Sequence, residues 1–212
     1  MIRKESAAMA NAQLKEFRRT PAAHLAGAME AARVVGPRSV ALRELDSPLQ
    51  AGLRAKPGSE SARALESVLG FALPARVGEV AGRSDAGHVL WLSPDEFLYV
   101  DPSDTSQAAV ADLEASLEGL PGHAVDLSAN RTVFELSGRA SEELLEKGCN
   151  ADLHPREFPA GRAIATQLAH VPILLHRVDQ SLWRLFPRAS FADFVARWIM
   201  DAMTEYRQSD VL

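Results

Sequence analysis

The stretch Asp126–Pro155, DLSANRTVFELSGRASEELLEKGCNADLHP, indicates the fold of the chain more clearly than any other. Side chains at 132, 134 and 136 alternate with those at 131, 133 and 135, which predicts a strand. Ser137 and Gly138 end this strand, because glycine tolerates the positive φ of a tight turn. The stretch therefore reads as strand, turn, short helix and exit loop.

The helix of this unit carries signals at both ends. Ser141 is expected to cap its N-terminus, and Gly148 is placed as the left-handed residue that commonly follows a helix C-terminus. His154-Pro155 closes the unit, since proline extends neither a helix nor a strand ladder. We find no pattern in the unit that predicts chemistry on its own.

Composition limits the function further. The chain has 212 residues, 47% of them hydrophobic and 24% charged, and a net charge of -5, which is ordinary for a globular protein. The acidic balance argues against nonspecific nucleic-acid binding. Cys149 is the sole cysteine, so an internal disulfide is excluded and a reducing cytoplasm is favoured. Neither a secretory signal nor a membrane-spanning run is indicated.

Periodicity outside this unit predicts further elements. Ser59 or Ser61 and Gly70 bound one helix, and capping boxes at 104–107 and 190–193 begin two others. The run 89–92 is apolar on both faces and is expected in a central strand. We predict strands over 40–45, 49–55, 77–81, 88–92, 97–100, 163–169, 173–178 and 182–186, and helices over 22–34, 59–70, 104–120 and 190–206.

This order of elements predicts an α+β fold. Helices alternate with antiparallel strands, and the glycine-rich turns of a nucleotide-binding parallel sheet are missing. We expect two ferredoxin-like halves that share one core. An alanine-rich N-terminal arm over 1–38 precedes a domain over 39–212, with halves at about 39–122 and 123–212.

Candidate catalytic and metal-binding residues are weak. Cys149 lies beside Lys147 at a helix exit, where the helix dipole disfavours a thiolate, so a structural role is favoured over a nucleophile. The histidines form neither HExxH nor a close pair with the cysteine, which argues against zinc. Carboxylates in turns are usually solvated or capping. The residues considered were His24, His88, His123, His154, His170, His176, Asp126, Asp152 and Glu157.

Binding motifs are equally sparse. The loop 82–87 has the wrong glycine spacing for phosphate and sits in a predicted hairpin. No serine lies in a GxSxG context. The tryptophans are expected in the core rather than against a flat ligand. Arginines near loops could bind an anionic tail, although a solvated or ion-paired role is favoured. These residues are Ser93, Ser128, Ser137, Trp91, Trp183, Trp198, Arg131, Arg162 and Arg188.

Three segments carry a resemblance to a known family. They are WLSPDEFLYV, the stretch from Asp126 to Gly161 with its KGC–x2–DLHP–x2–F–x2–G motif over 147–161, and LWRLFPRASFADFVARWIMDA. Together they resemble the gamma subunit of heterotetrameric sarcosine oxidase, over roughly residues 40–206. The resemblance implies a fold like the folate-binding T-protein of glycine cleavage.

The resemblance also implies partners and cofactors. In such oxidases the alpha subunit holds NAD and a folate site, the beta subunit holds FAD and the amine site, FMN lies between them, and delta binds zinc. The enzyme oxidises sarcosine with oxygen and passes a one-carbon unit to tetrahydrofolate. The gamma subunit of the family has no assigned catalytic residues. We therefore expect no catalytic, cofactor-binding or metal-binding residue in this chain.

The first hypothesis is a non-catalytic, cytoplasmic gamma subunit that packs against alpha and stabilises it, in a complex with beta and delta. A gamma subunit of a related N-methyl amino-acid dehydrogenase is an alternative. So is a stand-alone folate-binding or one-carbon protein, although the KGCYxGQE motif of T-protein-like iron–sulfur maintenance proteins is incomplete here, since KGC is followed by Asn150-Ala151-Asp152. A redox protein that uses Cys149 is the third option.

Overall fold

The computed structural model describes residues 19–103 and 108–207. Within these ranges no helix has the length and apolar character that a membrane crossing requires. The elements are η1 (Ala23–Leu25), α2 (Ala26–Ala32), β1 (Ala41–Glu44), β2 (Leu49–Arg54), α3 (Glu60–Leu69), β3 (Val80–Gly82), β4 (His88–Ser93), β5 (Glu96–Asp101), α4 (Ala108–Ser116), β6 (His123–Asp126), β7 (Phe134–Ser137), α5 (Ser141–Glu146), β8 (Arg162–Leu168), β9 (Val171–Asp179), β10 (Leu182–Pro187), η2 (Ala189–Phe191), α6 (Ala192–Met203) and η3 (Thr204–Arg207).

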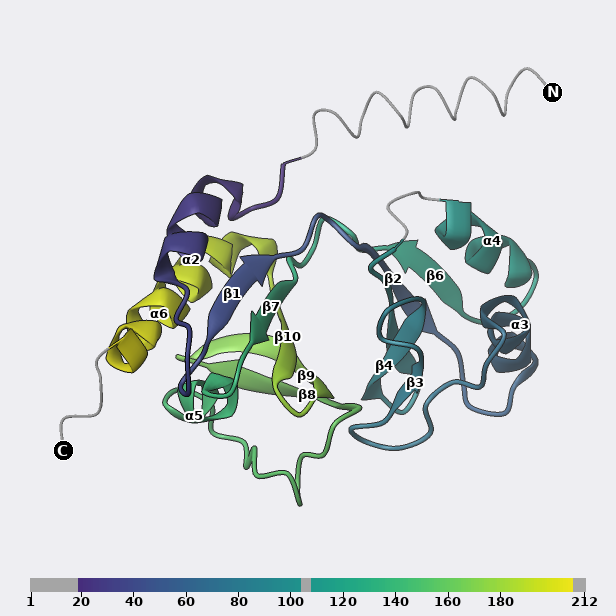
Figure 1. The fold of residues 1–212 in the computed structure, drawn as a ribbon. Helices are drawn as coiled ribbons and strands as arrows, with labels where there is room; N and C mark the ends of the chain where they lie inside the picture. Colours follow the sequence, from purple (N-terminus) through teal and green to yellow (C-terminus); the bar gives the residue numbers. More distant parts are fainter. Residues whose placement is uncertain (1–18, 104–107, 208–212) are drawn as a thin grey trace.

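Two antiparallel sheets of five strands each form the centre of the molecule. Their strand orders are β1-β7-β10-β9-β8 and β3-β4-β5-β2-β6. Helices α2, α5 and α6 lie on the outer side of the first sheet, and α3 and α4 lie on the outer side of the second (Figure 1). The α+β class predicted from the sequence is confirmed.

Both sheets repeat one strand order. The second sheet contains the series β2-α3-β4-β5-α4-β6. Counted along the chain, its four strands lie side by side in the order fourth, first, third, second (β6-β2-β5-β4), which is the order of a ferredoxin-like fold, and β3 is added at the edge next to β4. In the first sheet β7, β9 and β10 take the same places, β8 is the added edge strand, and β1 occupies the fourth place. The chain thus enters the first sheet with β1, builds the second sheet, and returns.

Strands β1 and β6 each lie in the sheet formed mainly by the other half of the chain. The two sheets therefore differ from the halves 39–122 and 123–212 expected from the sequence. The early strand β1 pairs with β7, for example Leu42 with Leu136. The later strand β6 pairs with β2, for example Ala124 with Leu53. Strand periodicity identifies which face of a strand is apolar, but it does not name the neighbouring strand.

The buried apolar residues form three clusters, one of which both sheets share. One cluster lies between the first sheet and its helices and includes Phe134 and Trp183. A second lies between the other sheet and its helices and includes Phe97 and Leu65. A third, between the sheets, contains Leu90, Leu98, Val100, Val133, Ala163, Leu174 and Phe186. Strand β4, predicted to be central, faces two clusters through Val89 and Leu90.

Residues 19–38 of the predicted arm belong to the folded body. Leu25, Met29 and Ala32 are buried in the cluster under α6. The Glu44 carboxylate accepts hydrogen bonds from the Ala22 backbone N–H, at 3.1 Å, and from the Thr20 hydroxyl. Residues 1–18 lie outside the described part of the chain.

Several local signals are confirmed. Ser59 caps α3, with its hydroxyl accepting from the Ala62 N–H at 3.2 Å, and Gly70 follows this helix with φ 78°. Gly138 has φ 114°, and a Cβ there would lie 2.3 Å from the Ser39 carbonyl oxygen. The turn after β7 therefore requires glycine.

Three other capping predictions are wrong, and a fourth falls outside the described residues. Ser141 does not cap α5; its hydroxyl donates to the Gly138 carbonyl at 2.7 Å. Gly148 has no positive φ, and a Cβ there would lie 2.6 Å from the Trp198 ring, so close packing requires this glycine. Asp193 pairs with His24 and Arg197 instead of closing a capping box with Ser190. The 104–107 box is not described.

Candidate functional site

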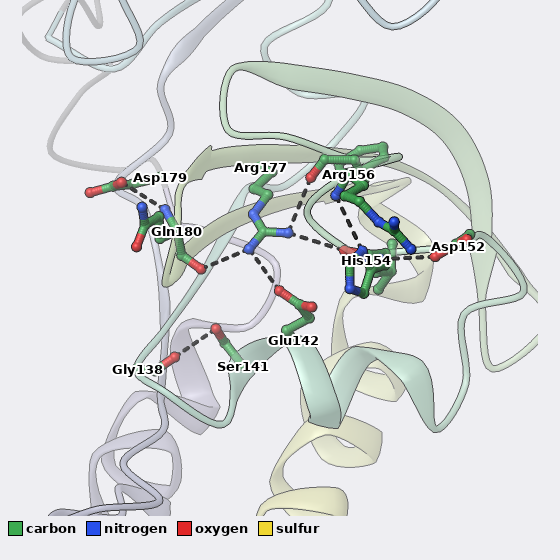
Figure 2. Close-up of polar contacts among 11 residues, drawn as sticks. Gly138, Ser141, Glu142, Asp152, His154, Arg156, Arg177, Asp179 and Gln180 are labelled. Atoms are coloured by element: carbon green, nitrogen blue, oxygen red, sulfur yellow. Dashed lines mark hydrogen bonds and ion pairs between the residues drawn. The ribbon is translucent and has the colours of Figure 1, made fainter.

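Arg177, on β9, is the centre of the densest buried polar network of the described residues. Its guanidinium donates to the backbone carbonyls of Leu153, Phe158 and Gln180, at 3.0, 3.1 and 3.1 Å, and to the Glu142 carboxylate at 2.7 Å. The Arg177 side chain is 3% exposed. Figure 2 shows the guanidinium reaching α5, the exit loop and the β9–β10 turn at once.

Aromatic rings support this network. The Arg177 guanidinium carbon lies 4.7 Å from the centroid of the Trp183 ring, which stacks on Phe158 with centroids 5.6 Å apart. The exit loop after α5 contains Leu153 and Phe158, both buried. Two of the four hydrogen bonds of Arg177 go to carbonyls of this loop, those of Leu153 and Phe158, so the motif over 147–161 has an architectural role.

A second buried network joins the two sheets. Glu135, on β7, accepts from Arg184 Nε at 3.3 Å and from Arg43 Nε at 2.8 Å. Arg184 also donates through Nη1 to the carbonyl of Ser84, in the β3–β4 hairpin. The loop 82–87 therefore anchors one sheet to the other, and it offers its carbonyl to an arginine rather than its N–H groups to a phosphate.

Two buried histidines lie on the facing sides of the sheets. The rings of His88, on β4, and His176, on β9, have centroids 5.4 Å apart, and both residues are 0% exposed. Nδ1 of His88 lies 3.1 Å from the Ala86 carbonyl. Nε2 of His88 and both ring nitrogens of His176 have no hydrogen-bond partner among the described residues.

The environment of this pair disfavours positive charge. Burial lowers the pKa of His88 from 6.5 to about 4. Burial, followed by the nearby charges of His88 and Arg184, lowers the pKa of His176 to about 3. Both imidazoles are therefore neutral near pH 7, and neither is poised to exchange protons there.

The cysteine has a structural environment. Cys149 is 8% exposed, and its Sγ lies 3.7 Å from the Thr166 hydroxyl oxygen. Its backbone forms an isolated bridge with Leu168 at the end of β8. Lys147 points elsewhere, with Nζ 2.6 Å from the Glu205 carboxylate and 4.4 Å from the Tyr206 ring centroid. The structure does not bring a base to the thiol through Lys147.

The other candidates considered from the sequence are dispersed. Asp126 and Asp152 each accept from a backbone N–H two residues later. His170 is exposed in a turn, whereas His176 is buried, so the two do not form a pair. Across residues 19–103 and 108–207, no group of three or more His, Cys, Asp or Glu side chains could hold a metal ion. Sequence analysis missed Arg177 and Arg184, because a charged side chain in a strand is usually interpreted as facing solvent.

Comparison with known proteins decides the family. The chain matches the sarcosine oxidase, gamma subunit family over residues 53–205. The sarcosine oxidase subunit gamma of Corynebacterium sp. (strain U-96) is 50% identical over 196 residues, which cover 92% of this chain and 95% of that protein. The chain belongs to the sarcosine oxidase gamma subunit family. The resemblance inferred from the sequence is thereby confirmed.

Other members and structures agree with this family. The subunit gamma of Arthrobacter sp is 48% identical over 195 residues, covering 92% of this chain and 94% of that protein. A chain in the structure of heterotetrameric sarcosine oxidase from Corynebacterium sp. U-96, in complex with pyrrole 2-carboxylate, is similar with a TM-score of 0.89 at 50% identity, covering 92% of this chain and 100% of that chain.

The fold is also that of a glycine-cleavage protein. Aminomethyltransferase T of the glycine cleavage system from Bartonella henselae has a TM-score of 0.63 at 15% identity, with 90% of this chain and 62% of that chain covered. At this identity the likeness concerns the fold alone. The T-protein-like architecture expected from the sequence is confirmed.

We expect the variant Cys149→Ser to fold and to lower the free energy of unfolding by no more than ~2 kcal/mol, the cost of burying a poorly paired hydroxyl. Thr166 offers that hydroxyl a partner, because its oxygen lies 3.7 Å from the sulfur. Urea unfolding of wild type and variant measures the loss. If the variant unfolds like wild type but the complex assembled with it loses oxidase activity, the thiol has a chemical role.

Proposed function

We propose that this chain is a non-catalytic gamma subunit of a heterotetrameric sarcosine oxidase, and that it packs against the alpha subunit and stabilises it. The observation that carries the proposal is the near-complete match to gamma subunits, 92% of this chain and 95% of the relative at 50% identity. A match over nearly all of a subunit supports the same role for this chain.

The use of polar groups supports the proposal. The buried arginines bind backbone carbonyls and carboxylates of this chain, as Arg177 and Arg184 do. In the loop 82–87 the Ser84 carbonyl accepts from Arg184, and the described residues include no group of three or more His, Cys, Asp or Glu side chains that could hold a metal ion. On the proposal, FAD, FMN, NAD and zinc belong to the partner subunits.

An exposed aromatic pair supports packing against a larger partner. Phe191 and Phe194 lie three residues apart at the start of α6 and are 41% and 49% exposed. Residues three apart on a helix are neighbours on its surface. Aromatic side chains are enriched at protein–protein interfaces, where they supply much of the binding energy.

On the same proposal, the assembled enzyme oxidises sarcosine with oxygen to glycine and hydrogen peroxide and transfers the one-carbon unit to tetrahydrofolate. The flavins supply the redox chemistry in the partner subunits. On this proposal the role of this chain is to provide, with its two sheets and outer helices, a surface for assembly.

The proposal predicts a clear difference between the isolated chain and the complex. The purified chain should show no visible flavin absorbance and no sarcosine oxidation. Co-expressed with the alpha, beta and delta subunits, it should co-elute with them in size exclusion, and omitting it should lower the unfolding temperature of alpha, because a bound partner stabilises the folded state. Flavin bands in the isolated chain, or an alpha subunit equally stable without it, would contradict the proposal.

A further inference from the structure

The inner face of the first sheet extends beyond the region that the second sheet covers. Four residues in or next to strands of the first sheet belong to the cluster between the sheets: Val133, Phe186, Leu174 and Ala163. Residues two positions apart in a strand share a face. The residues two positions from these four on the same face are, respectively, Arg131, Arg188, Pro172 and Ala165. These last four residues, together with Gln167, line an open groove of about 370 Å³.

The floor of this groove is mainly uncharged. Strand pairing places Ala165 opposite Leu174 and Gln167 opposite Pro172. Leu174 belongs to the apolar cluster between the sheets, so the groove continues that cluster outward. Strand β8 is the outermost strand of its sheet and has one strand neighbour, β9. The chain itself uses part of this outer edge, because the Ala163 N–H donates to the Gly78 carbonyl at 3.0 Å and Leu168 forms an isolated bridge with Cys149.

Two arginines stand at one end of the groove. Arg131 Nη1 donates to the Phe186 carbonyl at 2.9 Å, and Arg188 Nη1 donates to the Asn130 side-chain oxygen at 3.4 Å. Their backbones form an isolated bridge, which holds the two residues side by side. Within the part of the chain that the structure describes, neither arginine forms an ion pair with a carboxylate.

These positive charges are close enough to affect each other. Burial, and then the charge of Arg188, lowers the pKa of Arg131 below its ordinary value. The chain as a whole has a net charge of -5, so two adjacent arginines without a carboxylate form a local exception. A carboxylate placed between them would relieve the repulsion and could bind the planar guanidinium groups in a bidentate way.

We propose that the groove between Arg131, Arg188 and the edge of β8 is a docking site for an extended, acidic segment of a partner subunit of the oxidase. The inference rests on the proposed function, since it needs a multi-subunit complex. The apolar floor favours a polypeptide over a small anion, and the arginine pair requires at least one Asp or Glu side chain.

The test is assembly of the full chain with the other oxidase subunits, measured as a dissociation constant for wild type and Arg188→Glu. We expect Arg188→Glu to weaken binding by roughly tenfold or more, because a like charge then faces the acidic segment. Arg76→Glu, at an exposed arginine outside the groove, is the matched control and should stay within about twofold. Circular dichroism and thermal melting confirm that the variants fold.

The possible results separate the two proposals. A wild-type chain that does not assemble overturns the proposed function. Wild-type assembly with Arg188→Glu binding equally well overturns the docking site and leaves the function standing. A wild-type self-dimer that Arg188→Glu abolishes would assign the groove to a second copy of this chain and overturn the inference as stated.

A cross-link identifies the occupant directly. In the Gln167→Cys variant a thiol-directed cross-linker is attached in the groove, and mass spectrometry of the assembled complex locates the joined peptide. We expect a partner peptide with Asp or Glu close to the linked residue. A linked peptide without a carboxylate, or no cross-link within an assembled complex, would overturn the proposed occupant.

Discussion

Replacing Arg177 by methionine should lower the free energy of unfolding by about 3–5 kcal/mol, the range for removing one partner of a buried, hydrogen-bonded charge pair. The variant leaves three backbone carbonyls and the Glu142 carboxylate without their donor (Figure 2). Native domains are stable by only about 5–15 kcal/mol, so such a loss approaches the whole margin. Urea unfolding of the full chain measures it.

The control for this experiment is Glu142→Gln. Its side chain is 26% exposed, and glutamine keeps an acceptor oxygen for Arg177, so the loss should be about 1 kcal/mol. Limited proteolysis adds a local readout: the Arg177→Met variant should be cut faster within residues 148–161, because local opening of this loop costs less. A loss below about 1 kcal/mol in Arg177→Met would refute the structural role of the arginine.

The second large effect is a loss of stability in acid that depends on the two buried histidines. Folding lowers the pKa of His88 to about 4 and that of His176 to about 3, from 6.5 in the unfolded chain. At pH values between the folded-state pKa and 6.5, the unfolded chain binds protons that the folded chain does not. The stability from neutral, buried imidazoles is therefore fully present above pH 6.5 and is lost as the pH falls towards 4.

Each histidine should add a slope of about 1.4 kcal/mol per pH unit to the free energy of unfolding within that window. The variant His176→Gln should show a flatter acid limb than wild type, by about this slope. His123→Gln, at an exposed histidine, controls for loss of an ordinary titrating group. Denaturant unfolding at a series of pH values from 4.5 to 7.5 gives both slopes, and equal slopes for wild type and His176→Gln would disprove the assignment.

The contacts of Arg177 and Arg184 could not be predicted from the sequence, whereas local elements could. The alternation in residues 132–136 was sufficient to predict β7, and Ser59 with Gly70 was sufficient to bound α3. Each of these signals depends on neighbours within a few residues. By contrast, Arg177 contacts groups that lie 3 to 35 positions away, and Arg184 reaches Ser84 over a separation of 100. No local pattern specifies such partners.

The same reasoning applies to the candidate site. The motif over 147–161 could be recognised from the sequence as specific to a family, but its physical role follows from the arginine that binds its backbone carbonyls. Asp193 shows that a local sequence signal can also predict a contact that the structure does not contain. Its spacing from Ser190 predicted a capping box, yet His24 and Arg197 take up its carboxylate, at 2.7 and 2.9 Å, because tertiary contacts outweigh a weak local preference.

The sequence alone determined the class of fold, most of the helices and strands, and the family, because periodicity, turn residues and a specific motif are all properties of short segments. Only the tertiary structure decided that β1 and β6 exchange sheets, that His88 meets His176, and that Arg131 and Arg188 share an exposed groove. The physical reason is that the alternation of a strand indicates which side chains share a face, whereas the partner of that face is selected by the packing of the whole chain.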